Sequence, residues 1–460
     1  MKRSNSATPL TGFSFAQAQF QQMVEDVLKQ AKSLGATDAV AEVSEGCGLS
    51  VSVRLGELEN VERNRDKSLG VTVYVGQRRG SASTSDFSPQ AMRQTVQAAL
   101  DIARFTAEDA AAGLPDEADL VSSEQAQRDL DLFHPWAIDA SQACDLARTC
   151  EHAALETDRR ITNSEGAAVS SQQFHFWAGN SRGFRGGYPT SRHSVSVAPI
   201  AGKGKGMQRD AWYTSARDPA DLASAQAVGR YAAERALARL RSRKVATCEV
   251  PVLFESPVAA GLMSSLVGAV SGGALYRKAS FLLDSLGTRV LAPHLDLHED
   301  PFVRKGRGSA PFDEEGVSTQ ARHVVEEGVL NGYFLSTYSA RKLGMRTTGN
   351  AGGAHHLSLT SRLTRPEDTL EALISRLERG FLVTDLMGQG VNGVTGDYSR
   401  GASGFWIEGG QIAFPVEEVT IAGNLKEMFL GIAAVGADVY VSGSRSVGSV
   451  LLDHMKLAGS

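Results

Sequence analysis

The chain has 460 residues, 42% of them hydrophobic, with a formal net charge of −5 and a sequence pI near 6.1. This length predicts two or three folding units that bury a core without disulfides or structural metals. The acidic balance argues against a nucleic-acid-binding protein, and four cysteines without a CxxC pair indicate a reducing compartment. The sequence contains no apolar run of signal-peptide or membrane-spanning length, so we expect a cytoplasmic protein that does not engage a membrane.

Helical and strand periodicities follow one another through the first half of the chain. The predicted elements are a helix at 14–34, strands around 51–55 and 71–75, a helix starting at Ser88-Pro89, an acidic connection at 107–135, a helix at 140–156, a strand meander over 160–215 with a hairpin tip at 202–206, and a helix from Asp218-Pro219 to about Ser242. Helices beside a strand meander favour an α+β architecture over alternating βαβ units.

The second half of the chain reads as one large β-rich domain. Ser256-Pro257 predicts a helix start, and a further helix is expected at 366–379 with Gly380 as its stop. We therefore predict an α+β fold in which an N-terminal region of helices and antiparallel strands precedes a β-rich, barrel-like or sandwich-like C-terminal domain. The predicted segments are 1–110, 111–244 packed with the first, and 245–460.

The histidines do not form a recognisable metal motif. HExxH is absent, and the pair His294 and His298 lies between prolines that disfavour the helix needed to bring both rings to one face. His355 and His356 are adjacent, so in an extended segment their rings point in opposite directions. These patterns predict ordinary surface or core histidines.

Ser181 lies in Gly179-Asn180-Ser181-Arg182-Gly183, which matches GxSxG. A nucleophile elbow needs a strand, a sharp turn and then a helix, whereas this match falls inside a strand meander. A chance match is the better interpretation. An autonomous peptidase with a cryptic site, built on Ser181 or on a cluster of His294, His298 and Glu299, stays open as an alternative.

Several segments of the C-terminal half carry a family resemblance. They are Ser271–Lys278, Ser280–Gly287, Tyr338–Met345, Thr347–Gly353, Thr395–Glu408 and Pro415–Leu425. Together they resemble the PmbA/TldE branch of the TldD/PmbA family, densely over residues 245–430 and more loosely before them. The resemblance implies a subunit of a two-chain cytoplasmic metalloprotease complex that processes or degrades small unfolded peptides.

In this family the TldD-type subunit holds zinc with an HExxxH helix and a late cysteine. The resemblance places Glu255, Ser256 and Ala260 at the corresponding positions here, and no cysteine follows Cys248. An alanine methyl cannot bind zinc, and a serine hydroxyl is a poor general base. The resemblance therefore implies that this chain has no catalytic residue and no metal of its own. Zinc is expected in a TldD-like partner with which the chain forms a heterodimer. The chain alone is expected to form a homodimer.

Two glycine-rich strand segments are candidates for the wall of a peptide chamber, because glycine lets a peptide backbone approach closely. The candidate residues are Gly349, Asn350, Gly352, Gly353, Gly401, Ser403 and Gly404. The alternative is that these glycines only permit tight turns and bends. The family is also named a modulator of DNA gyrase, so a non-proteolytic regulator of gyrase or toxin pathways is a further alternative.

Overall fold

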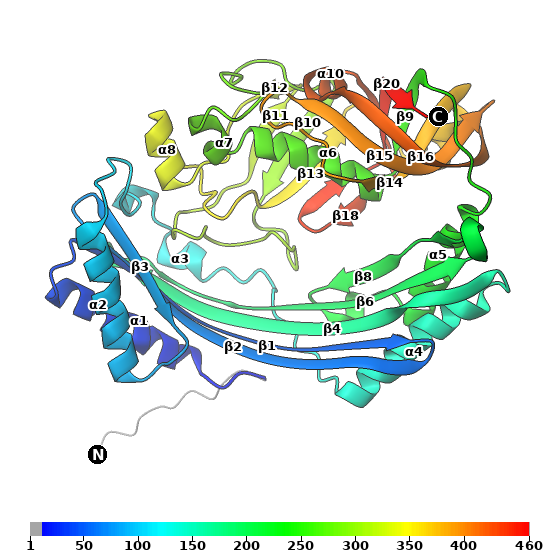
Figure 1. Ribbon diagram of the computed structural model, residues 1–460. Helices are drawn as coiled ribbons and strands as arrows, with labels where there is room; N and C mark the ends of the chain where they lie inside the picture. Colours follow the sequence, from blue (N-terminus) through cyan, green and yellow to red (C-terminus); the bar gives the residue numbers. More distant parts are fainter. Residues whose placement is uncertain (1–11, 460) are drawn as a thin grey trace. The chain divides into compact units, whose positions relative to one another are not determined.

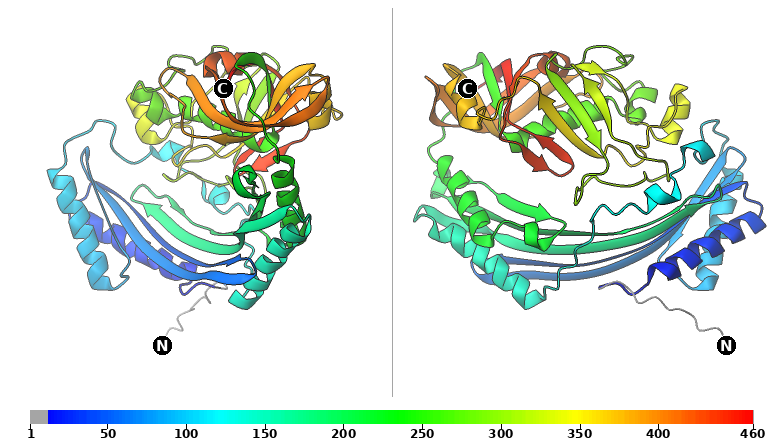
Figure 2. Two further views of the ribbon diagram at one scale, coloured as in Figure 1. Left: turned by 45° about the vertical axis from the view of Figure 1, so that its right-hand side comes forward. Right: turned by 180° about the vertical axis from the view of Figure 1, so that it is seen from behind.

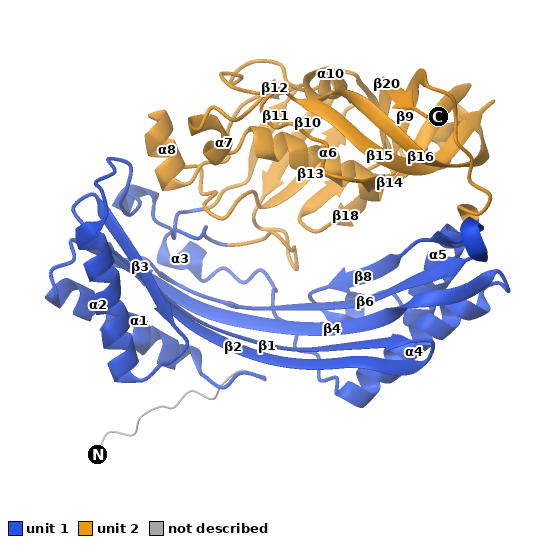
Figure 3. Cartoon of the chain, viewed as in Figure 1, with its two compact units in different colours: residues 1–237, 311–318 blue, residues 238–310, 319–460 orange. Residues whose placement is uncertain are grey.

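The computed structural model describes residues 12–459, which form two compact units (Figure 3). Unit 1 runs to Leu237 and includes the separate segment Pro311–Ser318. Unit 2 contains Ala238–Ala310 and the chain from Thr319 onward. Each unit has its own sheets and its own hydrophobic core, as independently packed domains do.

One antiparallel sheet dominates unit 1 (Figure 1). Its strands in spatial order are β3 (Arg78–Thr84), β2 (Glu57–Val75), β1 (Asp38–Arg54), β4 (Ile161–Asn180), β6 (Pro189–Ala201) and β7 (Gln208–Arg209), with β5 (Arg185–Gly186) beside β4 and β8 (Trp212–Ala216) beside β6. The long strands curve, and α1 (Gln17–Ser33) and α4 (Ala140–Glu156) lie on the convex side of the sheet near its two ends (Figure 2).

Helices also belong to unit 1, and the three longest each bury one apolar stripe. They are α1 (Gln17–Ser33), α2 (Pro89–Phe105), α3 (Ser123–Ala126), α4 (Ala140–Glu156) and α5 (Ala225–Ala238), with short 3-10 turns at Glu117–Asp119, Gly204–Gly206 and Pro219–Asp221. The α2 helix packs so closely on β3 that a Cβ at Gly80 would lie 2.0 Å from the carbonyl oxygen of Ala99. This close approach explains why a glycine occupies the middle of that strand.

A closed β-barrel forms one part of unit 2. Its strands are β9 (Cys248–Phe254), β14 (Arg379–Met387), β15 (Asp397–Glu408), β16 (Gln411–Asn424) and β20 (Val450–Ala458), and β17 (Ile432–Val435) extends the sheet beside β20. The barrel closes where β16 pairs with β20, with Ile421 opposite Leu457. β9 and β14 run parallel, and the other barrel pairs are antiparallel.

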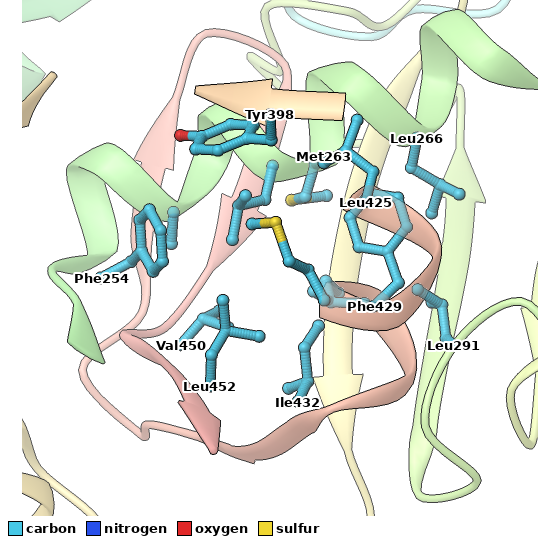
Figure 4. Packing of buried hydrophobic residues seen from close by; sticks show 14 of the residues in the cluster. Phe254, Met263, Leu266, Leu291, Tyr398, Leu425, Phe429, Ile432, Val450 and Leu452 are labelled. Carbon is cyan, nitrogen blue, oxygen red and sulfur yellow. The ribbon is translucent and has the colours of Figure 1, made fainter. Parts of the chain in front are cut away.

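A second sheet and five helices complete unit 2. The sheet has the order β12 (Val329–Leu330), β11 (Arg322–Glu326), β10 (Leu295–Asp300), β13 (His356–Ser361), β19 (Arg445–Val447) and β18 (Tyr440–Ser442). The helices are α6 (Ser256–Ala269), α7 (Gly272–Tyr276), α8 (Thr337–Leu343), α9 (Leu370–Ser375) and α10 (Leu425–Leu430). Side chains from the barrel, α6 and α10 share one buried core, in which Phe254, Met263 and Phe429 lie together (Figure 4).

The predicted α+β class with a β-rich, barrel-like C-terminal domain is confirmed. The helix predicted from Asp218-Pro219 to about Ser242 is wrong at both ends: Asp218 caps a 3-10 turn, and α5 spans only Ala225–Ala238. The helix expected at 366–379 is also shorter, because α9 ends at Ser375 and the predicted stop Gly380 lies inside β14. The three predicted segment boundaries remain a prediction.

Among the described residues, no helix combines the length and the apolar character that crossing a membrane requires.

Candidate functional site

The junction between β9 and α6 contains the positions that the resemblance aligns with the family's zinc helix. β9 ends at Phe254, Glu255 occupies the N-cap position, and Ser256 is the first residue of α6. The Glu255 amide donates to the carbonyl of Val383 on β14 at 3.0 Å. Ser256 is therefore inside its helix, unlike Ser88, which precedes α2 and caps it by accepting from the Ala91 amide.

A hydroxyl and a carboxylate fix the first turn of α6 from a neighbouring segment. The Ser256 amide donates to the Ser449 Oγ at 3.1 Å, and that hydroxyl donates to Asp438 Oδ2 at 2.6 Å. Asp438 also accepts from the Ser449 amide at 3.1 Å. An amide at a helix start has no partner within the helix, so Ser449 fulfils a capping role from a distant part of the sequence. Ser449 and Asp438 thus satisfy the first amide of α6 within the protein itself.

The donor groups at this helix start do not fit zinc. Glu255, Ser256 and Ala260 are all buried, and Ala260 packs in the hydrophobic core of unit 2. One carboxylate, a neutral hydroxyl and a methyl group do not supply the imidazole and thiolate ligands of a zinc site. Across residues 12–459, no three His, Cys, Asp or Glu side chains assemble in an arrangement that holds a metal ion.

The candidate chamber residues at 349–353 lie in a loop that a buried carboxylate organises. Glu299, only 1% exposed, accepts at Oε1 from Asn350 Nδ2 at 2.7 Å and from the His355 amide at 2.9 Å. Its Oε2 accepts from Arg322 Nε at 2.8 Å. The same guanidinium donates to Asn350 Oδ1 at 3.1 Å. We call Glu299, Arg322, Asn350 and His355 the Glu299 network; it ties β10 and β11 to this loop.

The loop backbone adopts conformations that favour glycine. Gly349, Gly352 and Gly353 have φ angles of 69°, 92° and 116°. One ring nitrogen of His355, Nε2, lies 2.9 Å from the Gly349 carbonyl, which closes the loop from inside. Gly349 and Asn350 are buried, whereas Gly352 and Gly353 are exposed. The network therefore anchors a loop whose two exposed residues at the surface of unit 2, Gly352 and Gly353, carry no side chain.

The other candidate residues, Gly401, Ser403 and Gly404, lie in the interior of β15. β15 pairs with β14 on one side and with β16 on the other, so it has no free edge there for an added peptide strand. A Cβ at Gly404 would lie 1.8 Å from the carbonyl oxygen of Leu382 on β14. Close strand approach thus requires this glycine, whereas the nearest atom to a Cβ at Gly401 is 3.5 Å away.

The residues of the alternative hydrolytic sites are not brought together. The Ser181 hydroxyl donates to Asp38 at 2.7 Å and accepts from the Ala39 amide at 3.1 Å, in a turn after β4. Within unit 2, both His294 ring nitrogens face oxygen atoms, the Ser361 hydroxyl at 2.8 Å and the Ile432 carbonyl at 2.9 Å. His298 and Glu299 are neighbours on β10 and therefore face opposite sides of its sheet.

The two adjacent histidines that follow the loop, His355 and His356, are both buried. His355 is 7% exposed and His356 is 8% exposed. Burial lowers the pKa of His356, and the negative charge of Asp300 opposes that shift only in part. The His355 ring thus contacts the Gly349 and Gly308 carbonyls, whereas burial favours the neutral form of the His356 ring.

The sequence alone indicates Glu299 only as a member of a possible hydrolytic cluster and does not predict that Arg322 is its partner. One signal was present: Leu295, Leu297 and Glu299 alternate, so Glu299 falls on the buried face of β10. A carboxylate in that register needs a cationic partner. The identity of that partner depends on the pairing of β10 with β11.

Three models of the PmbA/TldA metallopeptidase domains match this chain: domain 1 over residues 39–103, the central domain over 133–240 and the C-terminal domain over 247–459. The metalloprotease PmbA of Escherichia coli O157:H7 is 48% identical over 94% of each chain. The chain belongs to the PmbA/TldD metallopeptidase family. The predicted resemblance to this family is confirmed.

Two further family members extend the comparison over almost the whole chain. The metalloprotease PmbA homolog of Haemophilus influenzae is 44% identical over 100% of both chains. A crystal structure from Bacteroides thetaiotaomicron, which carries the name modulator of DNA gyrase, superimposes with a TM-score of 0.89 at 27% identity over 96% of this chain and 99% of that one. The family and its fold therefore apply to both units of the chain.

Proposed function

We propose that this chain is the metal-free partner subunit of a cytoplasmic metalloprotease complex whose zinc is held by a TldD-like subunit. The observation that carries the proposal is the chemistry at the start of α6, where Glu255, Ser256 and Ala260 stand in place of two imidazoles and a catalytic carboxylate. Family membership supports a role in proteolysis, since curated relatives of full length carry the name metalloprotease.

The chain contributes binding surface to the complex instead of catalysis. An unfolded peptide approaches most closely where no side chain intervenes, and the exposed backbone at Gly352 and Gly353 is such a place. A Cβ at Gly353 would meet no atom within 4 Å, so this position opens outward. The Glu299 network keeps the segment rigid, which reduces the entropy lost when a peptide binds. In isolation, the chain forms a homodimer.

The test is reconstitution with a TldD-like homologue from the same source. The two chains are purified separately and mixed, and cleavage of a dye-labelled unstructured peptide is followed. We expect no cleavage by this chain alone and cleavage by the mixture that a chelator abolishes. Gly353→Trp should raise the KM of the mixture for the peptide without changing its zinc content. Cleavage by this chain alone contradicts the proposal.

A further inference from the structure

Two histidines of unit 2 lie side by side on neighbouring strands. The ring of His298 on β10 and the ring of His323 on β11 have their centres 4.9 Å apart. His298 is half-buried and His323 is exposed, so solvent reaches the pair. Within residues 12–459, neither ring has a hydrogen bond or an ion pair. The ring nitrogens of both histidines are therefore available to a ligand.

The other eight of the ten histidines offer no comparable pair in the part of the chain that the structure describes. His356 is buried, at 8% exposure. The remaining seven each have a ring nitrogen beside a carboxylate, hydroxyl or carbonyl oxygen; they are His134, His152, His175, His193, His294, His355 and His454. Free and adjacent imidazoles thus occur together at one place.

A β-bulge in β11 brings the two histidines together. The register places Leu297 opposite Val325 but His298 opposite His323, so Val324 is an extra residue in β11. An uninterrupted antiparallel register would put His298 opposite Val324 instead. Bulges re-aim side chains and are frequent beside functional sites.

The same bulge fixes the backbone beneath the pair. It brings Arg322 opposite Glu299, and Arg322 Nε donates to the Glu299 carboxylate at 2.8 Å. Successive residues of a strand face opposite sides of the sheet, so this buried ion pair and the two imidazoles lie on opposite faces of β10 and β11. The Glu299 network therefore holds the strands from one face while the histidines stand on the other, which limits the reorganisation needed to bind a ligand.

The charges around the pair favour a cation. Asp296 and Asp300 lie two residues before and after His298 and share its face of β10. Asp296 accepts from the Arg362 guanidinium at 2.8 Å and 2.9 Å. Asp300 accepts from the Phe302 amide at 2.8 Å and has no cationic partner among the described residues, so its charge is not neutralised. A carboxylate beside two neutral imidazoles attracts positive charge.

Imidazole nitrogens are preferred ligands of copper, zinc and nickel. A metal–imidazole bond is about 2.0–2.1 Å long, so one ion bridges two nitrogens up to about 4 Å apart, which rings at this separation allow. Among residues 12–459, no third His, Cys, Asp or Glu side chain completes such a group. Water therefore fills the other coordination positions, and binding is reversible.

We propose that His298 and His323 form a reversible bis-imidazole site for a divalent transition-metal ion, with Cu²⁺ bound most tightly. The site is separate from the start of α6 and does not depend on the proposed function. Zinc sites that retain their ion use three or four protein ligands, so this pair does not predict stoichiometric zinc in the desalted chain.

The first test is isothermal titration calorimetry of the full chain with CuCl₂ in a non-coordinating buffer at neutral pH. We expect one saturable site in the micromolar range. His298→Asn and His323→Asn should each weaken it at least about tenfold, because one imidazole alone does not chelate. His454→Asn, at an exposed histidine of the same unit, and Glu255→Ala, at the start of α6, are the matched controls and should bind like the wild type.

The second test is electron paramagnetic resonance with one equivalent of Cu²⁺. The wild type should show two coordinated imidazole nitrogens, and each of His298→Asn and His323→Asn should show one fewer. His323 is exposed, so His323→Asn should keep the wild-type Tm, which separates loss of the site from loss of the fold. Absence of saturable binding, or binding that both substitutions leave intact, overturns the proposal. Binding that His454→Asn weakens as much as His323→Asn does places the copper elsewhere and also overturns it.

Discussion

Asn350 Nδ2 donates to Glu299 Oε1 at 2.7 Å, although 51 positions separate the two residues in the sequence. Both side chains are buried, and the carboxylate also neutralises Arg322. The conformation of the glycine loop thus depends on one carboxylate in β10. This dependence makes Glu299 the residue through which loop geometry can be perturbed without touching the loop.

Glu299→Gln should destabilise unit 2 by about 3–5 kcal/mol, because it leaves the largely buried Arg322 guanidinium without its counter-charge. Urea unfolding measures the loss. Glu326→Gln, at the exposed end of β11, is the matched control and should cost less than about 0.5 kcal/mol. Equal stability of both variants would mean that the Glu299 network does not support the fold.

Gly404→Ala should be poorly tolerated, since its Cβ would collide with the Leu382 carbonyl at 1.8 Å and force β14 and β15 apart. We expect a loss of about 2–4 kcal/mol in the free energy of unfolding. Gly401→Ala in the same strand meets its nearest atom at 3.5 Å and should fold normally. Equal behaviour of the two variants would show that strand packing does not explain Gly404.

Protonation of His193 should weaken unit 1 at low pH. Burial lowers the pKa of His193, whose ring lies 3.0 Å from the Ser171 hydroxyl and 2.8 Å from the His134 carbonyl. The unfolded state then binds a proton that the folded state resists, so stability is complete above the unfolded value of about 6.5 and falls as pH decreases below it.

Urea titrations between neutral and mildly acidic pH measure this loss for the wild type and for His193→Gln. The variant should be less stable near neutrality but should show a shallower pH dependence. An unchanged pH dependence in the variant would show that protonation of His193 does not cause the loss of stability at low pH.

Ser181→Ala should leave peptide cleavage by the reconstituted complex unchanged, because Ser181 bonds to Asp38 and to the Ala39 amide in a turn after β4. Loss of these bonds should cost about 1 kcal/mol of stability. A fall of cleavage to background in a fully folded variant would instead support the autonomous hydrolase.

Capping residues and apolar periodicity predict those helices and hairpins that are determined by residues close together in the sequence. The start of α2 at Ser88-Pro89 and the buried stripe of α4 follow from capping and periodicity alone. The end of α9 does not follow from these local patterns, because Gly380 belongs to β14 and pairs with Ile407 on β15. Tertiary pairing overrides the local preference of glycine to stop a helix.

The candidate sites also differ in how much of each can be predicted from the sequence. The sequence shows directly that Glu255, Ser256 and Ala260 carry a carboxylate, a hydroxyl and a methyl group, and only the family resemblance places them at the positions of a zinc helix. The Glu299 network could not be assembled from the sequence, because its members come from β10, β11 and a loop that meet only in the folded sheet.

Metal analysis of the isolated chain measures whether this polypeptide binds zinc by itself. The chain is expressed with added zinc, desalted, and measured by inductively coupled plasma mass spectrometry beside a TldD-like homologue treated identically. We predict less than about 0.1 zinc per chain here and about one in the homologue. Stoichiometric zinc in this chain, lost on Glu255→Ala, would contradict the account.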